Sequence, residues 1–192
     1  MKKAVFLDRD GTINADEFGY INKPEDLHLY PFAAEAIYKL NKMGYLVFVV
    51  TNQAGVAYGY FKIPDVDKIN AKLVSDLAEG NAKVDDIFYS PFHIKGIIEP
   101  FNIDHEDRKP GIGMFQKAKE KYDFDTKGSF MIGDRYSDIG FGNNAGLKTI
   151  FVRSGGGEDE FLQKRNKTIY KPDFVVRDLS VAVKLIEELD NK

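Results

Sequence analysis

Short runs of apolar residues alternate along the chain with longer segments in which apolar side chains recur every three or four positions. The short runs are rich in β-branched and aromatic residues and predict strands. We expect these strands at residues 4–7, 46–50, 87–89, 130–132, 149–152 and 174–176. The longer spacing predicts helices at residues 32–40, 66–77, 114–122 and 179–189. Strands that alternate with helices are typical of an α/β fold with a mainly parallel central sheet.

Two long segments, about 14–31 and 90–108, fit neither pattern. They contain Pro and Gly and follow the first and third predicted strands, where loops of α/β folds commonly wall a ligand site. A third irregular segment, 154–157, contains three adjacent glycines and predicts a flexible turn, with an anion-binding nest as the alternative. No repeat or linker divides the chain, so we expect one domain over residues 1–192 with two loop inserts.

The composition is that of an ordinary globular protein, with 43% hydrophobic and 30% charged residues among 192. Twenty-seven Lys and Arg face 30 Asp and Glu, so we expect no nucleic-acid or membrane partner. The chain contains no Cys, which excludes disulfides, thiolate zinc sites and cysteine nucleophiles. No apolar run approaches the ~20 residues that span a bilayer. We expect a cytoplasmic monomer.

The first predicted strand ends in two carboxylates, Asp8 and Asp10, followed by Gly11. Residues two apart in an extended strand point to the same side, and the carboxyl ends of central strands open onto the ligand crevice of α/β sheets. Two neighbouring carboxylates in a partly dry site need a cation or a shared proton, so a hard divalent metal is the expected partner. The alternative for this motif alone is a solvated acidic turn.

Polar side chains also follow two other central strands. Thr51 begins a Thr-Asn-Gln cluster over 51–53 and can offer a hydroxyl and backbone N–H groups to a phosphate oxygen. Asp134 follows the fourth strand and suits a metal ligand, while Asp138 suits a helix cap or an orienting group. Each cluster alone is also consistent with ordinary caps and turns. Their order along the chain supplies the parts of a phosphoryl-transfer site.

A basic pair, Arg108 and Lys109, precedes Pro110 and the third predicted helix. Lys109 can present a point charge to a phosphate, and we expect Pro110 to start the helix. The alternative for this pair alone is a solvated surface patch.

Taken together, these motifs resemble the four ordered motifs of the haloacid dehalogenase (HAD) superfamily, mostly Mg²⁺-dependent phosphatases. The resemblance rests on Asp8-x-Asp10-Gly-Thr12, Thr51, Lys109 and Gly133-Asp134-x-x-x-Asp138. Within the superfamily, Gly19-Tyr20, the 51–59 segment and Arg108-Lys109-Pro110 are similar to the histidinol-phosphatase-like branch. The resemblance implies a three-layer α/β/α, Rossmann-like fold. The segments available between the motifs are too short for a folded cap, so a capless member is expected.

The resemblance also implies a role for each motif. Asp8 would be the nucleophile that forms an aspartyl-phosphate, and Asp10 the general acid and base, a role that requires a raised pKa. Mg²⁺ would be held by Asp8, the Asp10 backbone carbonyl and Asp134. Thr51 and Lys109 would bind the phosphoryl oxygens, and Asp138 would orient Lys109. Substrate contacts are expected from Asn52, Gln53, Arg108, Arg135 and Tyr20, with ordinary surface arginines as the alternative for the two Arg residues.

The substrate that the resemblance implies is a small phosphorylated sugar. The branch includes enzymes of heptose metabolism, so the first expectation is removal of the 7-phosphate of D-glycero-D-manno-heptose 1,7-bisphosphate. Histidinol phosphate or another small phosphomonoester is the alternative. A receiver-like signalling domain, phosphorylated on Asp, is the non-enzymatic alternative, although both Asp8 and Asp10 follow the first strand and no suitable group ends the third.

Two departures from the branch bear on metals and substrate. Many members hold a structural zinc in the loop after the third strand, but the matching positions here are Ser90, Phe92, His105 and Asp107. Since no thiolate is present, zinc is not expected, and a nonstandard site at His93, His105 and Asp107 is the alternative. The loop is expected to be held by its apolar side chains: Phe92, Ile94, Ile97, Ile98, Pro100 and Phe101. The heptose phosphatases often carry basic residues where this chain has Tyr58 and Tyr60.

Overall fold

The computed structural model describes residues 1–16 and 19–191, so Glu17 and Phe18 of the first insert lie outside it. Its centre is a sheet in the order β3-β2-β1-β4-β5-β6, in which every neighbouring pair is parallel. The strands are β1 (Lys2–Leu7), β2 (Leu46–Asn52), β3 (Asp86–Ser90), β4 (Phe124–Gly133), β5 (Lys148–Val152) and β6 (Phe174–Val176). All six predicted strands are therefore confirmed, with β4 starting six residues earlier than expected.

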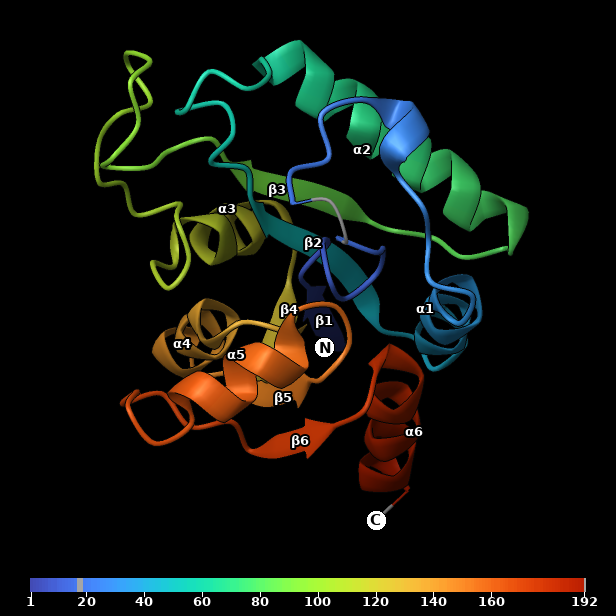
Figure 1. Ribbon diagram of the computed structural model, residues 1–192. Helices are drawn as coiled ribbons and strands as arrows, with labels where there is room; N and C mark the ends of the chain where they lie inside the picture. Colours follow the sequence, from blue (N-terminus) through green and yellow to red (C-terminus); the bar gives the residue numbers. More distant parts are fainter. Residues whose placement is uncertain (17–18, 192) are drawn as a thin grey trace.

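Helices cover both faces of the sheet, which confirms the three-layer α/β/α architecture (Figure 1). One face carries α1 (Ala33–Lys42), α2 (Ile63–Glu79) and α6 (Leu179–Asp190). The other carries α3 (Gly113–Lys121), α4 (Tyr136–Ala145) and α5 (Gly157–Lys164). A short 3₁₀ helix, η1 (Pro24–Asp26), lies in the first insert.

The alternation of side chains along β1 builds both cores. Val5 and Leu7 pack with α1, α2 and α6, whereas Ala4 and Phe6 pack with α3 and α4. All four side chains are fully buried, as expected for a strand in the middle of a doubly covered sheet. This burial fixes where β1 ends and therefore where Asp8 lies.

Two helices were not placed by hydrophobic periodicity. The side chains of α4 are buried nearly all round, so the helix shows no apolar stripe. The beginning of α5 lies at Gly157, inside the segment predicted as a flexible turn. Residues 154–156 form the predicted turn, whereas Gly157 already belongs to the helix. Ser154 Oγ donates a 2.7 Å hydrogen bond to the carbonyl of Gly11, and the turn packs against the loop after β1. Acidic residues in the first turn of α5 suit its helix dipole.

The expected helix start at Pro110 is wrong. The third helix begins at Gly113, with Ile112 at the N-cap. Residues 108–112 form a tight connection instead, in which the amides of Gly111 and Gly113 bond to the carbonyls of Arg108 and Glu106. Pro110 therefore belongs to the loop that carries Lys109.

The order of the strands determines where a ligand can bind. β1 and β4 are neighbours, but the chain runs from β1 to β2 on one side and from β4 to β5 on the other. Such a reversal opens a crevice at the carboxyl ends of the two strands. Asp8 follows β1 and Asp134 follows β4, so the fold brings both carboxylates to this crevice. No helix in the described ranges combines the length and apolar character needed to cross a bilayer.

Replacement of Phe6 by Ala tests this account of the core. The Phe6 ring lies 5.2 to 6.0 Å, centroid to centroid, from four other phenylalanines. Phe6→Ala should lower the free energy of unfolding by about 3–5 kcal/mol because it leaves a cavity. Ile169→Ala, at a side chain that is 85% exposed, should change it by less than about 0.5 kcal/mol. Urea denaturation measures both, and a loss below about 1 kcal/mol for Phe6→Ala would contradict the account.

Candidate active site

The loop after β1 is fixed by its neighbours on β4. The Asp8 amide donates a 2.9 Å hydrogen bond to the carbonyl of Ile132, which continues the pairing of β1 with β4. Gly11 has φ +84°, and a Cβ at this position would lie 2.5 Å from Oδ2 of Asp134. Glycine is therefore required for both the turn and the close approach to Asp134.

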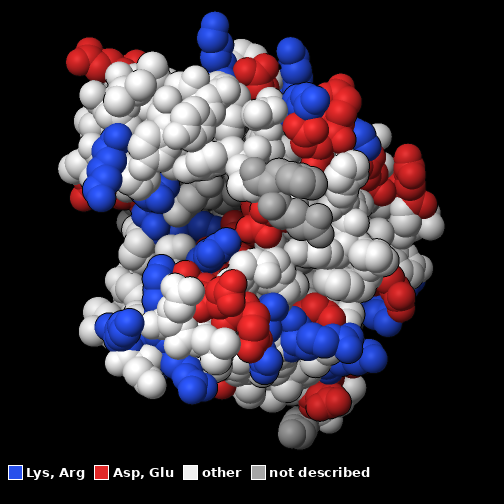
Figure 2. All heavy atoms as spheres, in the orientation of Figure 1, with Lys and Arg blue, Asp and Glu red and all other residues white. Residues whose placement is uncertain are grey.

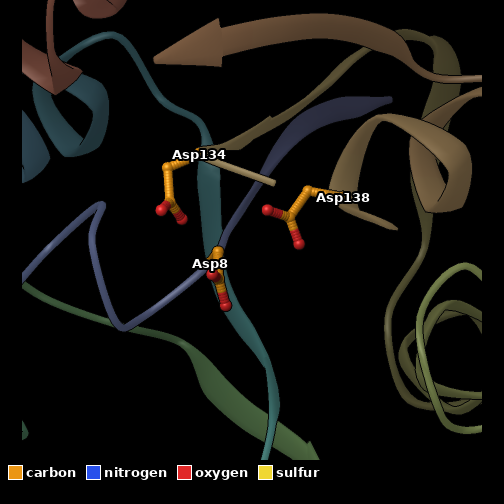
Figure 3. A group of neighbouring side chains, drawn as sticks. All are labelled: Asp8, Asp134 and Asp138. Atoms are coloured by element: carbon orange, nitrogen blue, oxygen red, sulfur yellow. The ribbon is translucent and has the colours of Figure 1, made fainter. Parts of the chain in front are cut away.

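Three buried carboxylates meet at the crevice. Asp8 and Asp134 directly follow β1 and β4, and Asp138 lies in α4; each offers an oxygen within 4.8 Å of the others (Figure 3). Burial, with the nearby charge of Asp138, raises the pKa of Asp8 to about 7 despite the opposing effect of Lys109. Burial and the nearby carboxylates of Asp8 and Asp138 raise the pKa of Asp134 well above its usual range. The group thus needs positive charge to be fully ionised.

Lys109 supplies one positive charge. Its Nζ lies 2.8 Å from Asp8, 2.7 Å from Asp138 and 2.6 Å from the carbonyl oxygen of Val50. Burial works to lower the pKa of Lys109, but Asp138 and Asp8 outweigh it, so the pKa is raised and the ammonium is retained. Asp138 also accepts a 2.9 Å hydrogen bond from the amide of Arg135, which caps α4. The contact between Asp138 and Lys109 is the one that an orienting role requires.

Asp10 has a different environment from that of Asp8. Its Oδ1 accepts 3.0 Å hydrogen bonds from Arg9 and Asn14, and its Oδ2 accepts hydrogen bonds from Arg9 at 3.0 Å and Gln53 at 2.9 Å. Burial works to raise the pKa of Asp10, but Arg9 and the two amides outweigh it, so the pKa is lowered. The expected raised pKa is therefore wrong, because these donors favour the carboxylate form of Asp10.

The end of β2 forms the opposite wall of the crevice. Thr51 is buried, and its hydroxyl accepts a 2.8 Å hydrogen bond from Gln53. Asn52 fixes the loop that carries Lys109: its Oδ1 accepts from the Lys109 amide at 3.0 Å, and its Nδ2 donates to the Lys109 carbonyl at 3.2 Å. Gln53, predicted to contact substrate, instead points at Asp10 and Thr51 with 2% of its surface exposed.

The crevice opens into a pocket of about 260 Å³. Most of the predicted site residues line it: Asp8, Asp10, Tyr20, Thr51, Asn52, Arg108, Lys109, Arg135 and Asp138, together with Asp16, Gly19 and Ser137. Asp134 and Gln53 lie beneath this surface, with 0% and 2% of their surface exposed. Figure 2 shows a hollow on this face in which acidic and basic side chains gather. The site is therefore open and strongly polar.

The two arginines at the rim have different partners. Arg135 lies 3.1 Å from Asp16, 3.1 Å from Asp134 and 3.9 Å from Glu160. Arg108 donates a 3.3 Å hydrogen bond to the carbonyl of Phe92, and no ion pair ties it to a carboxylate of residues 1–16 or 19–191. Arg108 is thus the rim cation available to an incoming anion.

An aromatic cluster, formed by Tyr20, Tyr58, Tyr60, Phe61 and His93, joins three loops beside the pocket. The Tyr20 ring lies 5.2 Å from that of Tyr60 and 6.1 Å from that of Phe61. Tyr58 stacks on Tyr60 and shares a 3.0 Å hydrogen bond with His93. Tyr58 and Tyr60, which stand where heptose phosphatases often carry basic residues, thus belong to a packed aromatic cluster.

The residues at the zinc positions of the branch are engaged with one another. His105 stacks on Phe92 with ring centroids 3.9 Å apart, and its Nδ1 accepts a hydrogen bond from the Asp107 amide. The Asp107 carboxylate pairs with Lys117 at 2.6 Å. The predicted apolar role holds for Phe92, whose ring packs on those of His105 and Phe101. It fails for Ile94, Ile97, Ile98 and Pro100, which are exposed.

Sequence reasoning gave no role to Arg9 or Asn14, the two side chains that hold Asp10 together with Gln53. Arg9 is fully buried and makes two of its side-chain hydrogen bonds to Asp10, the next residue in sequence. The sequence signal that could have identified Arg9 is its place between two carboxylates at the end of an apolar strand. A charged side chain in such a place is buried only when it is paired.

Comparisons with known proteins agree with this geometry. The HAD-hydrolase-like family model matches residues 107–182. The heptose-1,7-bisphosphate 7-phosphatase of Pasteurella multocida is 35% identical and covers 98% of this chain and 99% of its own. That of Thermosynechococcus vestitus is also 35% identical, with 96% of this chain and 95% of its own covered.

A solved structure shows the same fold. It is the D,D-heptose 1,7-bisphosphate phosphatase of B. bronchiseptica, complexed with magnesium and phosphate, and it superposes with a TM-score of 0.83 at 27% identity. The match covers 97% of this chain and 99% of that one. Fold, motifs and relatives agree, so the chain belongs to the heptose-1,7-bisphosphate 7-phosphatase family of HAD-like hydrolases.

Proposed function

We propose that the protein is a Mg²⁺-dependent phosphomonoesterase that removes the 7-phosphate of D-glycero-D-manno-heptose 1,7-bisphosphate through an aspartyl-phosphate. The observation that carries the reaction type is the meeting of three buried carboxylates and Lys109 at the end of β1. The names of the relatives supply the substrate. A receiver-like signalling role is disfavoured because the relatives over nearly the whole chain are enzymes.

The donor set suits Mg²⁺. Both carboxylate oxygens of Asp134 are buried without a hydrogen bond from any described residue, although the half-buried Arg135 lies 3.1 Å from one of them. The three carboxylates carry two more charges than Lys109 balances when all are ionised, which matches a divalent cation. We assign the metal to the carboxylates of Asp8 and Asp134 and the backbone carbonyl of Asp10. When bound, it would neutralise charge so that a carboxylate can approach a phosphate.

Asp8 is the proposed nucleophile. Lys109 holds its Oδ1, which leaves Oδ2 to attack phosphorus as the bond to the leaving sugar oxygen breaks. The Thr51 hydroxyl and Lys109 would bind the remaining phosphoryl oxygens, and Asn52 keeps the Lys109 loop in place. Water then cleaves the aspartyl-phosphate and regenerates the carboxylate.

Asp10 is the proposed general acid and base. It would protonate the leaving oxygen in the first step and accept a proton from the attacking water in the second. Its pKa is low in the ligand-free protein, so the incoming phosphate must raise it. A dianion in the adjacent pocket has this effect, because like charges disfavour ionisation of a neighbouring carboxylate.

The open rim suits an extended substrate. Arg108 is the cation proposed to meet a second phosphate, and Tyr20 lies on the same side of the pocket. Arg135, already held by Asp16, would contribute a more distant charge. Histidinol phosphate remains the second candidate substrate, supported by the motifs that the chain shares with that branch.

A substrate comparison tests the specificity. Both anomers of heptose 1,7-bisphosphate should give a kcat/KM at least about 10-fold above that of histidinol phosphate, since only the former can engage Arg108 through a second phosphate. Arg108→Ala should erase most of this preference and leave kcat for histidinol phosphate within about 3-fold. Steady-state kinetics measures each value. Equal kcat/KM for all three substrates would reject the heptose assignment.

Replacement of Asp8 tests the nucleophile. Asp8→Asn should lower kcat by at least about 10³-fold, since an amide cannot form the phosphoryl ester. The fold should persist because Asn is nearly isosteric, and circular dichroism checks it. Turnover at the wild-type rate would remove Asp8 from the mechanism.

The pH dependence of Mg²⁺ binding tests the metal site. Folding raises the pKa of Asp8 from 3.8 to about 7, so the metal-free fold holds a proton that the unfolded chain releases. Its stability should therefore fall as the pH rises from about 4 to 7. Mg²⁺ must displace the proton, so it should raise the thermal midpoint by about 5 °C or more at pH 7.5 and much less at pH 5.

The control for this experiment is Asp134→Asn, which should lose the Mg²⁺-dependent shift while remaining folded. EDTA should abolish turnover by the wild-type protein, and added Mg²⁺ should restore it. An equal thermal shift at both pH values, or in the variant, would contradict the proposed ligand set.

A further inference from the structure

We propose that Arg9 is a positioning residue for Asp10, and that its guanidinium sets how well the enzyme expels poor leaving groups. This inference rests on the proposed function, in which Asp10 gives a proton to the departing oxygen. Arg9 lies between the two catalytic aspartates in sequence, yet it does not line the pocket and would not touch substrate.

Arg9 makes a bidentate contact with the carboxylate of Asp10. Nε donates to Oδ1 and Nη2 to Oδ2, both at 3.0 Å, so both carboxylate oxygens are held by one rigid plane. Such parallel paired bonds fix orientation as well as distance. The side chain of Asp10 is 24% exposed, whereas that of Arg9 is 0% exposed. The carboxylate thus faces the pocket with its guanidinium support behind it.

The support is anchored to a second element. Nη1 of Arg9 donates a 2.9 Å hydrogen bond to Oδ1 of Asn70, a buried residue of α2. Among the described residues, Asp10 is the carboxylate that forms an ion pair with Arg9. Because a buried guanidinium stays charged and is costly when unpaired, Arg9 and Asp10 hold one another in place. The position of the acid group is therefore tied to α2 as well as to its own loop.

The contact between Arg9 and Asp10 should affect the rate of phosphoryl transfer to an extent that depends on the leaving group of the substrate. In the first step, the bond from Asp8 to phosphorus forms, the bond to the leaving oxygen breaks, and the proton of Asp10 moves to that oxygen. A misplacement of about 1 Å can cost about 100-fold when a proton must be delivered. A phenolate that departs without a proton avoids this cost. Loss of the paired hydrogen bonds from Arg9 should thus lower the rate of phosphoryl transfer from sugar phosphates far more than the rate from p-nitrophenyl phosphate.

The test compares single-turnover rates of phosphoryl transfer with excess protein, Mg²⁺ and either substrate. Arg9→Lys keeps the buried charge, and therefore the fold, but cannot form the paired contact. It should slow transfer from heptose 1,7-bisphosphate by about 30- to 100-fold and from p-nitrophenyl phosphate by less than about 3-fold. Asn70→Ala should show the same substrate dependence with a smaller loss. Lys72→Ala, an exposed change on α2, is the matched control and should leave both rates unchanged.

The outcomes separate this inference from the proposed function. If the variants lower the transfer rates from both substrates by the same factor, or lower neither rate, Arg9 has only a structural role or none, and the inference is overturned. If the wild-type protein with Mg²⁺ transfers phosphate from neither substrate, the proposed function fails and the inference fails with it. Circular dichroism and thermal midpoints of the variants establish that the rates describe folded protein.

Discussion

The electrostatic conflict among three buried carboxylates is the constraint on which the site depends. Asp8, Asp134 and Asp138 are nearly or fully buried, and Lys109 alone of the described residues joins two of them as a buried cation. Without further positive charge, burial and mutual repulsion raise the pKa of Asp8 and Asp134. The cost of this arrangement is understandable if the site exists to bind a divalent metal, whose positive charge would offset the repulsion among the carboxylates and let a phosphate approach Asp8.

The sheet makes this conflict possible. The strand order reverses between β1 and β4, with β2 added on one side and β5 on the other, which leaves space at the carboxyl ends of β1 and β4. Two buried cores hold both strands beneath this space. Gly11 then allows the first loop to approach Asp134 within a distance that no Cβ would permit. Asp8 and Asp10, two residues apart, consequently differ in character. One is crowded by carboxylates, while the other is held by four N–H donors.

Much of the candidate site could be predicted from the sequence. The side chains proposed to bind metal and phosphate lie at the ends of apolar strands, and parallel strands end at the same edge of the sheet. The positions of Asp8, Thr51 and Asp134 follow from that rule alone. Contacts that depend on side-chain direction could not be predicted. Gln53 turns back toward Asp10 rather than toward the pocket. Helix α4 shows no stripe because it is buried nearly all round, and α5 begins within a glycine run.

The most direct test of the account is identification of the residue that carries phosphate during turnover. The Asp10→Asn variant should slow the second step, and p-nitrophenyl phosphate needs no proton in the first, so the aspartyl-phosphate should accumulate when the two are mixed with Mg²⁺. The mixture is quenched in acid and treated with borohydride, which reduces an acyl phosphate. Peptide mass spectrometry should find the reduced side chain at Asp8, in amounts that depend on both substrate and Mg²⁺. Reduction at another carboxylate, or at none while phosphate is released, would contradict the account.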